Sequence, residues 1–154
     1  MVFRIPVSLV SLGYSSHSHR IMSNISNPEA FQYEAAVILA GAYGAFPMPF
    51  AWTHDADNEL YPTDTGQGRR DIQFQTITWL VAHDYLTDDG GVIGGRWQGL
   101  RLTERGLNVL NSVPDVLSGK EPLGKRLVVA VAKGSVNVIK QLIPMIIQQA
   151  IGDA

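Results

Sequence analysis

The sequence predicts an α+β domain followed by an amphipathic helical segment. A run with helical periodicity, 71–84, precedes two short apolar segments, 85–87 and 97–102. Between these segments lies a glycine-rich stretch, 90–95, which is typical of a hairpin tip. Residues 123–151 are again apolar with helical periodicity. A helix, a hairpin and further helices in this order predict a sheet with helices packed beside it.

Composition and charge limit the classes of function. A chain of 154 residues with 45% hydrophobic residues is long enough for one domain with a sizeable core. It has no cysteine, which excludes disulfides and thiolate metal sites. The net charge is −2. Residues 21–68 contain six acidic residues and no Lys or Arg, and no lysine precedes position 120. Charge alone therefore does not favour nucleic-acid binding.

The first predicted helix begins at Asn27. Asn27 is a capping residue, Pro28 suits the first helical position, and Glu29 places a negative charge in the first turn. We expect the helix to end near Tyr43, before Gly44. The apolar stripe predicted for this helix is Phe31, Ala35, Ile38, Leu39 and Ala42.

Residues 45–68 contain three prolines and no clear helical pattern. Phe46, Met48, Phe50 and Trp52 alternate with other residues, so we expect an edge strand or an extended arm here. Residues 55–68 read as a solvated acidic loop. Its first residues resemble a calcium loop, but the glycine and glutamate that such a loop needs at its sixth and twelfth positions are missing.

The helix predicted at 71–84 has two different faces. One is expected to be buried and carries Phe74, Ile77, Leu80 and Val81. The opposite face is expected to be exposed and carries Ile72, Gln75, Thr76, Trp79 and His83. Because an exposed tryptophan and isoleucine cover apolar surface better than they read DNA bases, this second face is the candidate partner-binding site.

A further helix is predicted after the hairpin, with Thr103 as its cap and Pro114 marking its end. Leu107 and Leu110 are expected to pack inward. We therefore divide the chain into four parts. These are a flexible extension (1–26, in which Met22 is an alternative start), a domain (27–113), a linker (114–122) and a helical extension (123–154).

The C-terminal extension predicts one helix or a helix pair, bent at Gly134-Ser135 or at Pro144. It is not a membrane span, because lysines and a proline interrupt it. Two interpretations are open: it closes the domain's own core, or it associates with a second copy, for which we expect a homo-oligomer. The residues proposed for self-association are Ile139, Leu142, Ile143, Ile146 and Ile147.

The order of the predicted elements resembles that of the winged helix-turn-helix proteins of prokaryotes and phages. In this order a helix, a strand, a glycine-rich tip and a second strand are followed by the motif Leu102-Thr103-x-x-Gly106-x-x-x-Leu110. The resemblance implies a two-stranded wing and a regulatory protein of the cytoplasm. It also implies that DNA-binding members place the helix at 71–84 in the major groove. Gln75, Thr76 and His83 would then read bases, and the phosphate contacts would be Arg69, Arg70, Arg96 and Arg101.

Three features argue against DNA and favour a protein partner. The predicted outer helix face carries Ile72 and Trp79. The acids Asp84, Asp88 and Asp89 would repel phosphate, and no lysine lies between residues 1 and 119. The leading hypothesis is therefore a binding module that contacts a protein or a second copy, with duplex DNA as the alternative. No nucleophile elbow and no helical His pair occurs in the sequence, so we expect no enzyme, no cofactor and no metal.

Overall fold

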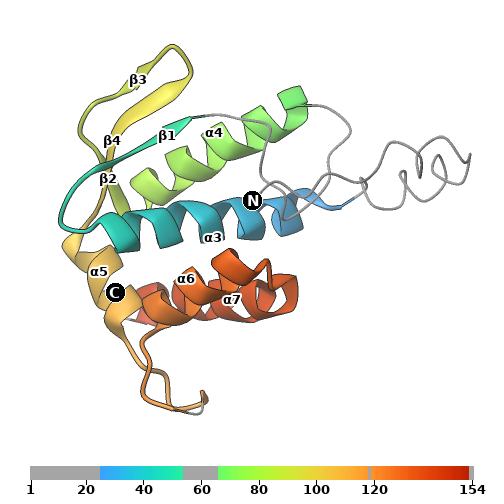
Figure 1. The fold of residues 1–154 in the computed structure, drawn as a ribbon, viewed down its shortest axis with the longest axis vertical. Coiled ribbons are helices and arrows are strands. Elements are labelled where there is room, and N and C mark those ends of the chain that lie inside the picture. The colour runs from blue at the N-terminus through green and yellow to red at the C-terminus, as the bar shows by residue number, and fades with distance from the viewer. Residues whose placement is uncertain (1–24, 54–65, 118, 153–154) are drawn as a thin grey trace, which may run out of the picture.

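The computed structural model of the chain describes residues 25–53, 66–117 and 119–152 (Figure 1). Within these ranges the fold is α+β, with five helices and a small antiparallel sheet of four short strands, which confirms the predicted class. The alternative start at Met22 lies outside the described residues, as do most of the predicted flexible extension and all but the last three residues of the predicted acidic loop. Those three residues, 66–68, are helical, so the helix predicted at 71–84 begins earlier than expected.

Helix α3 (Asn27–Ala45) is the central element of the fold. Ser26 Oγ accepts a hydrogen bond from the Glu29 backbone N–H at 3.3 Å, so Ser26 is the cap and Asn27 is already helical. The helix also continues beyond Tyr43, its predicted end. Its buried residues extend around most of the helix, beyond the single predicted stripe: Ala30, Tyr33, Glu34, Ala35, Ala36, Ile38, Leu39, Ala40 and Ala42.

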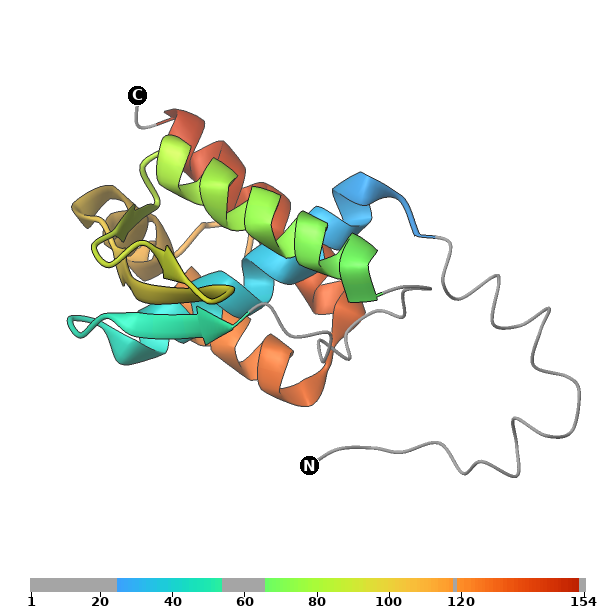
Figure 2. The same ribbon diagram turned by 90° about the horizontal axis from the view of Figure 1, so that it is seen from above.

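The other helices cover α3 from two sides. Helix α4 (Gly66–Ala82) crosses it on one side, as Figure 2 shows from above. Helices α6 (Leu123–Lys133) and α7 (Val136–Gly152) pack against it on the opposite side (Figure 1). Because five of the buried α3 residues are alanines, neighbouring elements can approach its backbone closely. One hydrophobic core therefore runs from the sheet through α3 to the C-terminal helices.

The sheet is built around strand β4 (Arg96–Leu102). Strand β1 (Phe50–Thr53) pairs with one edge of β4, and β2 (Leu86–Asp88) and β3 (Val92–Ile93) pair with it as well, all antiparallel. β3 and β1 pair with the same residues of β4, so they lie on its opposite edges. The edge strand expected around Phe50 and Trp52 is thus confirmed, and the predicted hairpin is present with its first strand shifted by one residue.

The pairing of β1 with β4 contains an irregularity that affects which side chains of β4 reach the core. Phe50 lies opposite Leu100, but Trp52 already lies opposite Trp97. Two residues three positions apart point to opposite faces of a regular strand, yet Trp97 and Leu100 are 5% and 0% exposed. The bulge therefore allows both side chains to reach the core.

Helix α5 (Glu104–Asn111) begins where the sequence predicted. Thr103 is its N-cap, and its Oγ1 accepts a hydrogen bond from the Gly106 N–H at 2.8 Å. The same hydroxyl donates to the Asp84 carbonyl oxygen at 2.6 Å, which fixes α5 to the end of α4. Leu110 is buried and Leu107 is half-buried, as expected for the inner face.

The C-terminal segment is a helix pair. α6 ends at Gly134, whose φ of 64° is the left-handed conformation that glycine adopts without strain. The break thus falls at Gly134-Ser135, and Pro144 lies inside α7. Lys140 Nζ lies 3.8 Å from Glu29 Oε2, which links α7 to the start of α3. None of the helices in the described ranges is long and apolar enough to cross a membrane.

Candidate interaction surface

The face of α4 that packs on α3 differs from the predicted one by a rotation of about 60°. Gln73 and Thr76 are 1% and 2% exposed, whereas Phe74, which was predicted to be buried, is 40% exposed. Thr76 can be buried because its hydroxyl donates to the Ile72 carbonyl oxygen at 2.7 Å, which leaves no unpaired donor. The prediction that Thr76 lies on the exposed face is therefore wrong.

Trp79 was also predicted to be exposed, but aromatic rings of its own chain cover it. Its ring centroid lies 5.2 Å from Phe31, 5.9 Å from Tyr85 and 3.8 Å from His83, which stacks on it. Trp79 and Ile72 are both half-buried and pack against the core. His83 remains exposed, with Nδ1 2.9 Å from the Trp79 carbonyl oxygen. Most of the apolar surface predicted for a partner is therefore used within the fold.

The surface that α4 presents to solvent is more polar than expected. Gln75, which was predicted to be exposed, lies on it together with Arg70, Asp71, Phe74, Thr78 and Ala82. Because the negative charge of Asp71 stands beside the single positive charge of Arg70, this helix face offers little attraction to a polyanion.

The β3–β4 hairpin, for which we use the name wing, adjoins this side of α4. The Phe74 ring lies 5.4 Å from Trp97, and Trp97 pairs across the hairpin with Val92. Val92 is 39% and Ile93 68% exposed. Figure 1 shows the β3–β4 hairpin projecting beyond the helices. We call the combined area the α4–wing surface: Phe74, Gln75, Thr78, Val92, Ile93 and Arg96.

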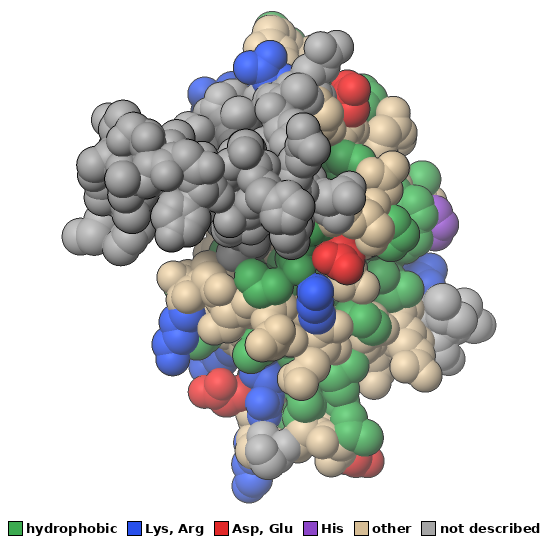
Figure 3. All heavy atoms as spheres, turned by 90° about the vertical axis from the view of Figure 1, so that its right-hand side faces the viewer, with side chains coloured by type: hydrophobic (Ala, Val, Ile, Leu, Met, Phe, Trp, Pro, Cys, Tyr) green, Lys and Arg blue, Asp and Glu red, His purple; other side chains and the backbone are tan. Residues whose placement is uncertain are grey.

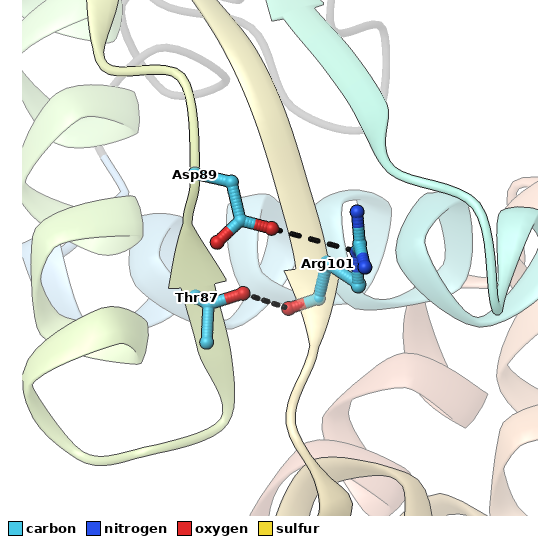
Figure 4. A network of polar contacts seen from close by, with 3 residues as sticks. All are labelled: Thr87, Asp89 and Arg101. Atoms are coloured by element: carbon cyan, nitrogen blue, oxygen red, sulfur yellow. Dashed lines mark hydrogen bonds and ion pairs between the residues drawn. The ribbon is translucent and has the colours of Figure 1, made fainter.

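The arginines assigned to phosphate contacts are in different environments. Arg101 Nε lies 3.5 Å from Asp89 Oδ2, and Thr87 Oγ1 donates to the Arg101 carbonyl oxygen at 3.5 Å (Figure 4). Asp89 therefore places a negative charge beside Arg101, which reduces the attraction of this arginine for phosphate. Arg70 and Arg96 are exposed, whereas the side chain of Arg69 lies outside the described part of the chain. On the face shown in Figure 3, the Lys and Arg side chains lie in small separate groups, not in one basic field.

The isoleucines and leucine assigned to self-association are mostly interior residues. They face α3 and the rest of the core, so they are not accessible to a second copy. Of the two interpretations of the C-terminal segment, their burial supports the one in which it closes the domain's own core. The exposed fractions are 0% for Ile139, 2% for Leu142, 1% for Ile143 and 0% for Ile146, and Ile147 is partly buried.

Two buried polar features were not foreseen. Glu34 is 0% exposed in the middle of α3, although the sequence analysis counted it only among the six acidic residues of 21–68. Tyr85 is 3% exposed, and burial raises the pKa of its hydroxyl while the charge of Arg105 partly opposes that rise. A carboxylate within a run of alanine, isoleucine and leucine was the only available signal for Glu34.

A polar cavity of about 470 Å³ lies where α5 meets the end of α4. Asp84, Thr103, Glu104, Arg105 and Asn108 line it. It combines two carboxylates with one guanidinium, and Thr103 is already committed to capping α5. In the ranges 25–53, 66–117 and 119–152, no three acidic or histidine side chains gather in a way that suits a metal ion.

Comparison of the chain with protein families, curated proteins and solved structures finds no match. The assignment of a function thus depends on the geometry described above.

Proposed function

We propose that this chain is a non-enzymatic binding module of the winged-helix type, which recognises another protein through the α4–wing surface. Support for the fold assignment comes from the order α3, β1, α4, β2 and a projecting hairpin. The family's short second helix would fall within residues 45–68, of which 54–65 lie outside the described ranges.

The observation that carries the proposal is the exposure of apolar side chains at the tip of the wing. Ile93 is 68% and Val92 39% exposed, and Phe74 extends the same apolar area onto α4. Apolar groups gain little from a phosphate backbone, whereas their burial against a protein partner is favourable by about 25 cal/mol for each Å², before the entropic costs of association. Aliphatic and aromatic side chains at a projecting tip therefore favour a protein surface over DNA.

Duplex DNA is the second candidate, because Arg70 and Arg96 are exposed and form no ion pair with any described residue. In this alternative Arg96 would contact phosphate from the wing. The weak point is electrostatic: Asp89 pairs with Arg101, and Asp71 lies next to Arg70. Two free guanidinium groups would support only weak binding, because the affinity for a phosphate backbone grows with the number of phosphates that are neutralised.

The test replaces Ile93 with a photo-activated benzophenone amino acid in cells that naturally produce the protein. We expect a discrete protein adduct, which Phe74→Asp abolishes and which is absent when the cross-linker replaces Val116 in the loop after α5. In parallel, random-sequence duplex DNA is titrated at low salt by fluorescence anisotropy. Adducts that nuclease removes, together with salt-dependent binding lost in Arg96→Ala, would establish the DNA alternative.

A further inference from the structure

The outer side of α6 carries a second exposed surface, separate from the α4–wing surface. Lys125, Val128, Val129 and Ala132 follow one another at the spacing i, i+3, i+4 and i+7, which places them along one side of the helix. All four are exposed, and the two valines are 37% and 45% exposed. Lys133 is exposed next to the last of them. We call these five residues the α6 stripe.

The fold does not need these valines. Leu123, Leu127 and Ala130 provide the inner face of α6 and are 0%, 0% and 3% exposed. A β-branched residue on an exposed helix face costs a few tenths of a kcal/mol relative to alanine. Two adjacent exposed valines therefore reduce helix stability and solubility without adding to the core, which is expected of residues that contact a partner.

The charges on α6 and α7 themselves are all positive. From Leu123 to Gly152 the sequence has four basic residues and no acidic one. Two of the four are engaged: Arg126 Nε donates to the Glu121 carbonyl oxygen at 3.0 Å, and Lys140 pairs with Glu29. Lys125 and Lys133 form no ion pair with a described residue, and they lie at the two ends of the valines. The stripe is thus apolar in its middle and positive at both ends.

From this arrangement we propose that the α6 stripe docks an acidic amphipathic helix of another protein. Acidic side chains of that helix would meet Lys125 and Lys133, and its apolar side would cover Val128 and Val129. The inference goes beyond the proposed function, because it uses a different helix on the other side of α3.

Other occupants fit less well. A two-fold symmetric contact between two copies of the stripe would bring lysines close to lysines, which is repulsive. A membrane-bound helix normally inserts aromatic or long aliphatic residues, and the stripe has only valine and alanine. A nucleic acid would leave the valines uncovered or in contact with phosphate.

The experiment pans a displayed library of random peptides, each about 16 residues or four helical turns long, on the full chain. The Val129→Glu chain serves as competitor in solution. We expect enriched peptides to be acidic with apolar residues at helical spacing. The strongest peptide should lose at least about tenfold in affinity on Val129→Glu and on Lys125→Glu/Lys133→Glu. Val116→Glu, at a valine that is 81% exposed in a loop, should change nothing.

Three results would overturn the proposal. In the first, no acidic peptides are enriched, or the peptides bind Val129→Glu as well as the unchanged chain. In the second, sedimentation shows a dimer of the full chain that Val129→Glu dissociates, which would assign the stripe to a second copy. In the third, vesicles of phosphatidylcholine with phosphatidylserine bind the chain and Val129→Glu abolishes that binding. Circular dichroism of each variant establishes that the fold is kept.

Discussion

Substitution of Gly124 by alanine tests whether α6 is a structural part of the core. A Cβ atom at position 124 would lie 2.6 Å from Cε1 and Cζ of Tyr43 and 2.8 Å from its Cδ1. The ring cannot swing away freely, because the Tyr43 hydroxyl donates to Asn111 Oδ1 at 2.8 Å. Gly124 is therefore a point of close approach between α6 and α3, and the added methyl group must displace α6 or the ring.

The size of the effect follows from opposing contributions. Overpacking of this kind costs about 1–3 kcal/mol. Movement of the ring would also break its hydrogen bond, which is worth about 1 kcal/mol. Replacement of a helical glycine by alanine offsets up to about 1 kcal/mol. We expect Gly124→Ala to lower the free energy of unfolding by about 1–3 kcal/mol, and the melting temperature to fall by several degrees.

The assay is urea unfolding followed by far-ultraviolet circular dichroism. Gly44→Ala is the matched control, because it lies in α3 with no atom within 4 Å of the added Cβ, and its stability should be unchanged or slightly higher. In a Tyr43→Ala background the penalty of Gly124→Ala should largely disappear, since the clashing ring is gone. A Gly124→Ala chain as stable as the original, or a penalty that persists without the Tyr43 ring, would refute the packing of α6 on α3.

Three further outcomes follow from individual contacts. Deletion of residues 123–154 should abolish cooperative unfolding, because buried side chains of α6 and α7 complete the core around α3, and a soluble, folded truncation would contradict this. Because burial raises the pKa of Tyr85 above its usual 10.0, its contribution to stability is complete below pH 10.0 and is lost as the pH rises through the raised value. Tyr85→Phe should therefore unfold less readily in alkali, as circular dichroism at increasing pH would reveal. Thr103→Ala should cost about 1 kcal/mol in urea unfolding because α5 loses its cap, whereas Thr87→Ala, with an exposed 3.5 Å contact, should cost little.

Local signals predicted most elements of this fold, although α4 begins at Gly66, inside the predicted loop, and β3 lies within the predicted glycine-rich tip. Capping and proline placement located the start of α3 to within one residue, and Thr103 was identified as the cap of α5. Gly134 was one of two positions predicted for the break in the tail, because glycine adopts a positive φ easily. These features depend on backbone chemistry within a few residues, which the sequence shows directly.

The faces of the helices were harder to predict. Periodicity placed Phe74 inside and Thr76 outside, because phenylalanine is more apolar than threonine. The structure reverses them, since Thr76 satisfies its hydroxyl within α4 and Phe74 can pack on Trp97 of the wing. Both contacts depend on a neighbour or a local hydrogen bond that a hydropathy pattern does not contain. The candidate surface changed accordingly from Ile72 and Trp79 to Phe74 and the tip of the wing.

The position of α3 explains why the C-terminal stripe is interior. An amphipathic helix shows only that one face needs cover, and it does not show what supplies that cover. α3 is buried around most of its circumference, and a helix of this kind needs packing partners on more than one side. α4 and the sheet supply one side, so α6 and α7 must supply the other. Once Ile139 and Ile143 are used in this way, the large apolar side chains that remain exposed in the described part of the tail are Val128 and Val129 on α6 and Val138 on α7. Val128 and Val129 lie next to each other on α6, so contacts of the C-terminal segment with another molecule are expected there, and not along the interior stripe of α7.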